Sequence, residues 1–108
     1  MSQDAAVLES GTGSSPERRL SIEGGLAGGY ALRRPVAVTV WEEGAEVVAD
    51  APDLDLHAFG DDTEAALMNL RARIVTHLAR LEEPGDRLAP RPRDERQRLR
   101  DLLIAPRV

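Results

Sequence analysis

The sequence contains no cysteine and no lysine, and it has only one Trp, one Tyr and one Phe among its 108 residues. Without cysteine, a disulfide framework and a thiolate metal site are excluded. Three aromatic residues are too few for a platform on which nucleic acid bases stack. No apolar run approaches the roughly 20 residues of a membrane span, and the first ten residues are too polar for a signal peptide. We therefore expect a cytoplasmic protein without membrane contact.

The charge is unevenly distributed along the chain. The chain has 19 acidic and 14 basic residues, all of the latter Arg, and its net charge is −5. Residues 36–83 carry a net charge of −8, whereas residues 84–108 carry +3. Nucleic acid is not expected to bind the acidic middle, because phosphate contacts need Lys and Arg. This part of the chain suits a basic protein partner, and a solvated acidic surface is the alternative.

Three regions of different composition follow one another. Residues 1–32 are rich in Gly and Ser without an apolar period, which predicts a flexible arm. Residues 33–83 alternate and then become helically periodic, as expected of an α+β domain. Residues 84–108 read as a proline-rich connector followed by a short basic amphipathic helix over 93–104.

Alternating apolar residues predict three short strands, at 35–41, 45–50 and 54–59. The "EEG" of residues 42–44 is a hairpin signal, so the strands are expected to form an antiparallel meander. On the first and third strands the side chains predicted to point inward are those of Val36, Val38, Val40, Leu54, Leu56 and Ala58.

An α-helix is predicted over residues 63–82, where apolar residues recur every three or four positions. The main apolar stripe consists of Leu67, Leu70, Ile74, Leu78 and Leu81. A second, weaker stripe about 100° round the helix consists of Met68, Ala72, Val75 and Ala79. The second stripe indicates burial against another element or another chain. The alternative is that its Ala residues only raise helix propensity.

Together these elements predict an α+β fold, in which a three-stranded antiparallel sheet is packed by one main helix and followed by a short C-terminal helix. Residues 86–90 are the candidate for a fourth strand. The ordered middle has only about 50 residues, which is marginal for an independent core. We therefore expect a homo-oligomer, a dimer or larger, with the second stripe as its surface.

Several acids gather where the third strand gives way to the helix. Asp53, Asp55 and Asp61 are the candidate ligands if the protein is a metal-dependent nuclease. A helix start explains the acids better, because an Asp before a helical period is a typical N-cap. Asp61 has the capping-box spacing to Glu64, and Asp62 is the other candidate cap. We expect no catalytic, cofactor or metal site here, and the choice of capping residue stays open.

A candidate partner surface lies on the sheet face that points away from the core. Asp55, His57 and Phe59 alternate with the inward residues, and Trp41 is the other large apolar aromatic. A DNA-binding tail is a further alternative, because residues 91–100 include five arginines. A helix-turn-helix needs two helices, however, and the proline-rich tail has room for one.

The segment "VAVTVWEEGAEVVADAPDLDLHAFGDDTEAALMNL" resembles the HicB antitoxin-like domain, and the resemblance covers roughly residues 35–83. It rests on a Pro-Asp-Leu step, a Gly-Asp corner and a helix start of the family's type. Asp62 stands where the family usually has a capping Thr, and Ala65 stands where it has Glu. The residues that carry the family corner are Pro52, Gly60, Asp61, Asp62, Ala66, Leu67 and Asn69.

The resemblance implies a partial ribonuclease-H-like fold without catalytic carboxylates. It also implies a non-enzymatic function, in which an antitoxin-type domain binds and occludes a small basic RNA-cleaving toxin. Family antitoxins often carry a DNA-binding domain after this region, and a chain of this length is expected to lack one. The main alternative is an orphan self-assembling regulatory or structural module. A metal-dependent nuclease and a DNA-binding repressor are the remaining hypotheses.

Overall fold

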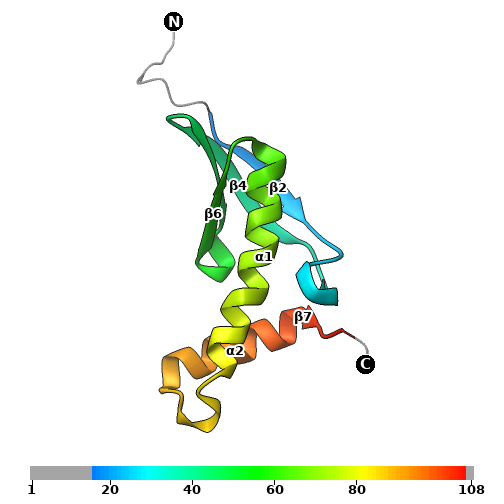
Figure 1. Ribbon diagram of the computed structural model, residues 1–108, viewed down its shortest axis with the longest axis vertical. Helices are drawn as coiled ribbons and strands as arrows, with labels where there is room; N and C mark the ends of the chain where they lie inside the picture. Colours follow the sequence, from blue (N-terminus) through cyan, green and yellow to red (C-terminus); the bar gives the residue numbers. More distant parts are fainter. Residues whose placement is uncertain (1–15, 107–108) are drawn as a thin grey trace, which may run out of the picture.

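The computed structural model describes residues 16–106 and shows an α+β fold (Figure 1). A four-stranded antiparallel sheet is covered on one face by the long helix α1, and a second helix, α2, lies near the far end of α1. The strands are β2 (Arg18–Ile22), β3 (Ala31–Leu32), β4 (Val36–Glu43), β5 (Glu46–Ala51), β6 (Leu56–Gly60) and β7 (Leu103–Ile104). The helices are α1 (Thr63–Glu82) and α2 (Pro90–Leu102), with short 3-10 turns η2 (Ala27–Gly29), η3 (Pro52–Leu54) and η4 (Gly85–Arg87).

The predicted antiparallel meander is confirmed as β4, β5 and β6, which are consecutive neighbours in the sheet order β2-β4-β5-β6. Gly44 has a φ of 64° in the β4–β5 turn, a conformation that glycine adopts without steric cost. The inward residues are also those that alternation predicts, because Val36, Val38 and Val40 on β4 are all buried. Residues 54–55 leave the predicted third strand, because Leu54 ends the η3 turn and Asp55 is the residue that follows it.

The fourth strand comes from a segment that was predicted to be unstructured. β2 pairs along β4, from Arg18 opposite Val40 to Ile22 opposite Val36, and Ile22 is only 1% exposed. The prediction of a flexible arm is therefore wrong for residues 18–32, and residues 1–15 of that arm lie outside the described residues. The physical reason is that pairing with β4 buries Ile22 in the core, a gain that the local composition of the segment does not indicate.

Residues 86–90, the sequence candidate for that strand, form no strand. The η4 turn covers Gly85–Arg87, and α2 begins at Pro90. Proline is well suited to the first turn of a helix, because its missing N–H has no intrahelical partner there. The second helix thus starts three residues earlier than the predicted position 93.

Helix α1 runs over Thr63–Glu82, which confirms the predicted bounds. Its buried face carries four of the five predicted stripe residues, and Ala66 takes the place of Leu67 in the first turn. Leu67 is only partly buried and packs at the margin of the core. The buried residues of α1 are Ala66, Leu70, Ile74, Leu78 and Leu81.

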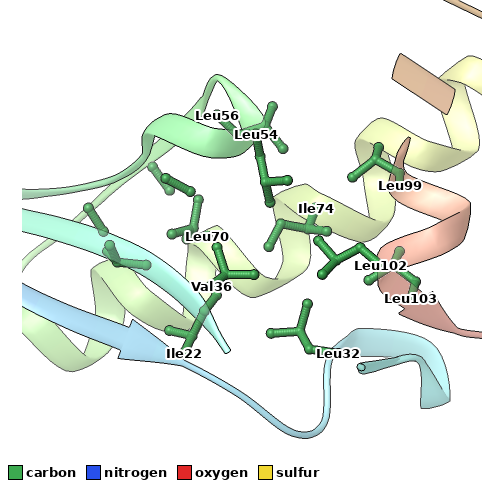
Figure 2. Close-up of a cluster of buried hydrophobic side chains, with 14 of the residues drawn as sticks. Ile22, Leu32, Val36, Leu54, Leu56, Leu70, Ile74, Leu99, Leu102 and Leu103 are labelled. Carbon is green, nitrogen blue, oxygen red and sulfur yellow. The ribbon is translucent and has the colours of Figure 1, made fainter. Parts of the chain in front are cut away.

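The core extends beyond the sheet and α1 into both flanking segments (Figure 2). Leu99, Leu102 and Leu103 of the α2–β7 region are buried. They lie near Ile74 and Leu32 in the same core cluster as the residues of the sheet. Backbone pairing also connects the two flanking segments, because β3 is antiparallel to β7. The core is therefore larger than the roughly 50-residue middle considered in the sequence, and small size no longer supports the expected oligomer.

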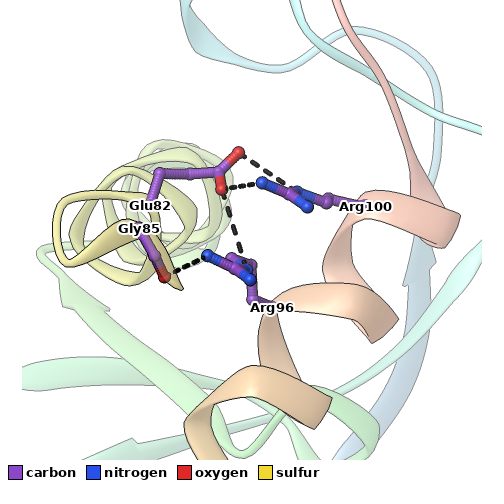
Figure 3. Close-up of polar contacts among 4 residues, drawn as sticks. All are labelled: Glu82, Gly85, Arg96 and Arg100. Atoms are coloured by element: carbon purple, nitrogen blue, oxygen red, sulfur yellow. Dashed lines mark hydrogen bonds and ion pairs between the residues drawn. The ribbon is translucent and has the colours of Figure 1, made fainter. Parts of the chain in front are cut away.

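Helix α2 is fastened to the end of α1 by charged groups (Figure 3). The Glu82 carboxylate accepts hydrogen bonds from Arg100 and lies 3.9 Å from Arg96 Nε. Arg96 also donates to the carbonyl oxygen of Gly85, at 2.9 Å. At the other side of the contact, His77 Nε2 lies 3.1 Å from Glu95 Oε2. Two arginines of the basic tail, Arg96 and Arg100, thus help to position α2 against the end of α1.

Candidate binding surface

One face of the four-stranded sheet packs on α1, and the other carries an apolar row at its centre. The strand register places Trp41 opposite Val48, and Val48 opposite Phe59. Val48 is only 3% exposed although it lies outside the core cluster beneath α1, because its neighbours in the row flank it on both sides. Phe59 remains 42% exposed. We call Trp41, Val48 and Phe59 the aromatic row.

The side chains of the aromatic row are held by their polar neighbours. The His57 ring meets the Phe59 ring edge to face, with centroids 5.6 Å apart and an interplanar angle of 83°. Trp41 Nε1 donates a hydrogen bond to Glu43 Oε1 at 3.3 Å. Both contacts limit the rotation of exposed aromatic side chains, which lowers the conformational entropy that a partner must remove on binding.

Carboxylates surround the aromatic row. Asp50 lies opposite His57 in the register, and Glu43 lies opposite Glu46 at the hairpin end. A hollow of about 300 Å³ is lined by the aromatic row together with Glu43, Asp50 and His57. An apolar centre with charged groups at its margin is the usual anatomy of a protein-binding surface.

The acidic corner is a helix start. Asp62 is the N-cap of α1, and its Oδ1 accepts a hydrogen bond from the Ala65 backbone N–H at 2.8 Å. The capping box between Asp61 and Glu64 is not formed, since Asp62 rather than Asp61 occupies the cap position. This resolves the choice that the sequence left open.

The other corner residues join the start of α1 to the end of β6. A Cβ at Gly60 would lie 2.3 Å from the Ala66 backbone nitrogen, so only glycine permits this close approach. Asn69 Nδ2 donates a hydrogen bond to the carbonyl oxygen of Phe59 at 2.7 Å. Pro52 begins the η3 turn before β6. Gly60, Asn69 and Pro52 of the family corner therefore have structural roles that follow from their contacts and positions in this fold.

The structure separates Asp55 from the other candidate surface residues. Asp55 has a left-handed backbone conformation, with φ at 55°, after the η3 turn. Its side chain lines a hollow beside Arg91, Glu95 and Arg98 of α2, away from Trp41, whereas His57 and Phe59 lie on the open sheet face as expected. The alternation predicted for Asp55 fails because β6 begins only at Leu56.

The acids considered for a nuclease do not assemble into a metal centre. Within residues 16–106, no three His, Asp or Glu side chains are placed to hold a metal ion. The ligand set required by the nuclease hypothesis, Asp53 with Asp55 and Asp61, is thus not brought together.

The second stripe of α1 is largely uncovered in the described part of the chain. Met68 is 63% exposed, Ala72 and Ala79 are exposed, and Val75 is half-buried. No other element of residues 16–106 buries the stripe as a whole. Contact with another chain through this stripe stays a prediction.

Three of the five arginines of α2 bond within the chain. Arg96 and Arg100 contact Glu82, and Arg93 donates to the carbonyl oxygen of Leu88. Arg91 and Arg98 line the hollow that also contains carboxylates. The described tail therefore lacks the continuous cationic face that phosphate binding favours.

Comparisons with protein-family models, with curated proteins and with solved structures found no match to this chain. The HicB-like assignment accordingly rests on the quoted residues alone. No helix among residues 16–106 has the length and apolarity that crossing a membrane requires.

Proposed function

We propose that this protein is a non-enzymatic binding module whose open sheet face holds a basic protein partner. The observation that carries the proposal is the aromatic row, Trp41 and Phe59 over a buried Val48, with carboxylates at its margin. Interface energy concentrates in aromatic anchors at the centre of a contact. Carboxylates at the margin speed encounter with a cationic partner and orient it.

The more specific form of this proposal is an antitoxin-type function. The chain would cover a small basic RNA-cleaving toxin in the cytoplasm and exclude its substrate sterically and electrostatically, with no chemistry of its own. Support comes from the HicB-like segment of the sequence and from the α+β fold. On the sheet face opposite α1, the carboxylates of Glu43, Glu46 and Asp50 outnumber the one arginine of β2, Arg19. Phosphate oxygens would be repelled from the same face, which favours a protein partner over RNA.

Co-expression with the protein encoded by the adjoining gene tests this proposal. We expect a complex on size-exclusion chromatography and loss of RNA cleavage by that protein. The double variant Trp41→Ala, Phe59→Ala should restore cleavage. Ile104→Ala is the matched control, because it also removes an exposed apolar side chain but on β7, away from the open face and the second stripe.

Two outcomes would count against the proposal. If no complex forms and the neighbouring protein cleaves no RNA, the antitoxin form is wrong. If a complex forms but the double variant inhibits as well as the original chain, the aromatic row is not the binding surface.

A second candidate function is self-assembly through the second stripe of α1. The exposure of Met68, Ala72 and Ala79 favours it, since apolar side chains grouped on one helix face are typical of contacts between chains. Light scattering should then give a multiple of the chain mass for the original protein and the single mass for Ala79→Asp. A monomeric original protein would exclude this function.

A further inference from the structure

A second surface lies on the other side of β6, where this edge strand meets α1. A groove of about 460 Å³ is lined on one side by residues 57–59 of β6. Its other side is formed by Asn69, Ala72, Arg73 and Thr76 of α1. Because β6 is the terminal strand of the sheet, the groove runs along an edge that no other strand of residues 16–106 covers.

The strand wall of the groove offers backbone hydrogen-bonding groups. The Phe59 carbonyl oxygen accepts from the Asn69 side chain, so it points away from β5 and toward α1. In an antiparallel strand the N–H and C=O of one residue face the same side, and the side alternates along the chain. The Phe59 N–H and both backbone groups of His57 therefore face the groove. By the same alternation these groups do not bond to β5, and no backbone bond outside the helices and strands reaches them within residues 16–106.

The helix wall leaves room for a chain and supplies one cation. Ala72 is small, while Asn69 and Thr76 add an amide and a hydroxyl. Arg73 is exposed and makes no hydrogen bond or ion pair with the described residues. Among the described residues, no carboxylate lines this groove, although the chain as a whole carries a net charge of −5. The groove is thus complementary to a negatively charged ligand, in contrast to the acidic open face.

We propose that this groove binds an extended segment of a partner protein, which adds a strand to β6 and places a carboxylate side chain against Arg73. Strand addition at a sheet edge draws affinity from main-chain hydrogen bonds and specificity from the side chains that the groove accepts. The neighbouring helix is what makes this edge a groove and selects an acidic residue. This binding goes beyond the proposed function, because it uses the backbone edge of β6 and Arg73 of α1. His57 and Phe59 line both the groove and the hollow on the open face, so the residues of α1 distinguish the two sites.

A blocked hexapeptide, acetyl-Val-Thr-Val-Glu-Val-Thr-amide, is the probe for an NMR titration of the full chain. We expect amide shifts concentrated at residues 57–59 and 72–76. Replacing Glu by Lys in the peptide should weaken binding about two- to fivefold, as expected for an exposed ion pair. The variant Arg73→Glu should reverse this ranking. Arg80→Glu, the same change two turns further along α1 and outside the groove, should preserve it.

N-methylation of the peptide separates strand pairing from simple charge attraction. One alternate set of peptide amides should tolerate methylation, and the other should lose binding, because only one set faces β6. The proposal is overturned if the peptide shifts no groove residue at millimolar concentration. It is also overturned if the shifts fall at Trp41, Val48 and Asp50 and not at residues 72–76, which would place the peptide on the open face. It is equally overturned if Arg73→Glu keeps the Glu preference or if both methylated sets bind alike.

Discussion

The two faces of the four-stranded sheet are built from alternate residues of the same strands, yet they differ in how they are completed. On the α1 face, Val36, Val38 and Val40 are covered by the helix and belong to one continuous core. On the open face, Trp41 and Phe59 cover only Val48 and remain partly exposed themselves. The first face accounts for stability, and the second presents apolar surface that the fold does not require. Substitutions on the two faces should therefore separate stability from binding.

The largest expected loss of stability comes from the α1 face. Leu70 is 0% exposed, so Leu70→Ala leaves a cavity and should lower the free energy of unfolding by about 2–5 kcal/mol. Urea denaturation followed by circular dichroism measures this loss. A loss below about 1 kcal/mol would mean that α1 is not packed on the sheet as described.

The next effect concerns the close approach of α1 to β6. Gly60→Ala would place a Cβ against the Ala66 backbone and should cost about 1–3 kcal/mol through overpacking. Gly44→Ala is a useful comparison, because nothing lies within 4 Å of its Cβ and only the positive φ opposes it. Thermal unfolding should rank Gly60→Ala as the more destabilised variant. The opposite ranking would contradict the geometry of the corner.

A smaller effect distinguishes the two adjacent acids at the helix start. Asp62→Ala removes the hydrogen bond to the Ala65 N–H and should cost about 1 kcal/mol. Asp61→Ala should change stability by less than about 0.5 kcal/mol, since Asp61 is exposed and does not occupy the cap. Equal losses measured by urea denaturation would show that the two acids share the cap.

The smallest effect on stability is expected at the margin of the aromatic row. The double variant Asp50→Asn, Glu43→Gln should unfold within about 0.5 kcal/mol of the original chain, because Gln can still accept from Trp41 Nε1. Association with a basic partner should slow and depend less on salt. Stopped-flow kinetics at two ionic strengths tests this, and an unchanged association rate would remove the electrostatic part of the account.

The sequence predicts the central part of the fold well, because β4, β6 and α1 have strong periodic patterns. β2 has only five residues, "RRLSI", before a Gly-rich stretch, and its strand forms through pairing with a distant segment. The last residues of the predicted C-terminal helix, 103–104, also leave it to pair with β3. Long-range pairing of this kind leaves no local signal in the sequence.

Long-range pairing also explains why the sequence indicates only some of the residues on the open face. Alternation places His57 and Phe59 on the open face, where the structure has them, but adjacent valines at 47–48 give no indication of which one faces outward. Asp50 joins the surface through the register with His57, which the hairpin turn fixes. The sequence alone does not distinguish Asp61 from Asp62 as the cap. The backbone does, because Asp62 has the extended conformation of a cap residue, with φ at −145° and ψ at 179°.

The most direct test of the open face as a binding surface is a calorimetric titration of the basic protein encoded by the adjoining gene. It would compare the original chain with the double variant Trp41→Ala, Phe59→Ala, and circular dichroism would verify that both are folded. The account predicts that the variant binds at least about 30-fold more weakly, as expected when a central aromatic anchor worth 2 kcal/mol is lost. Equal dissociation constants for the two folded proteins would contradict it.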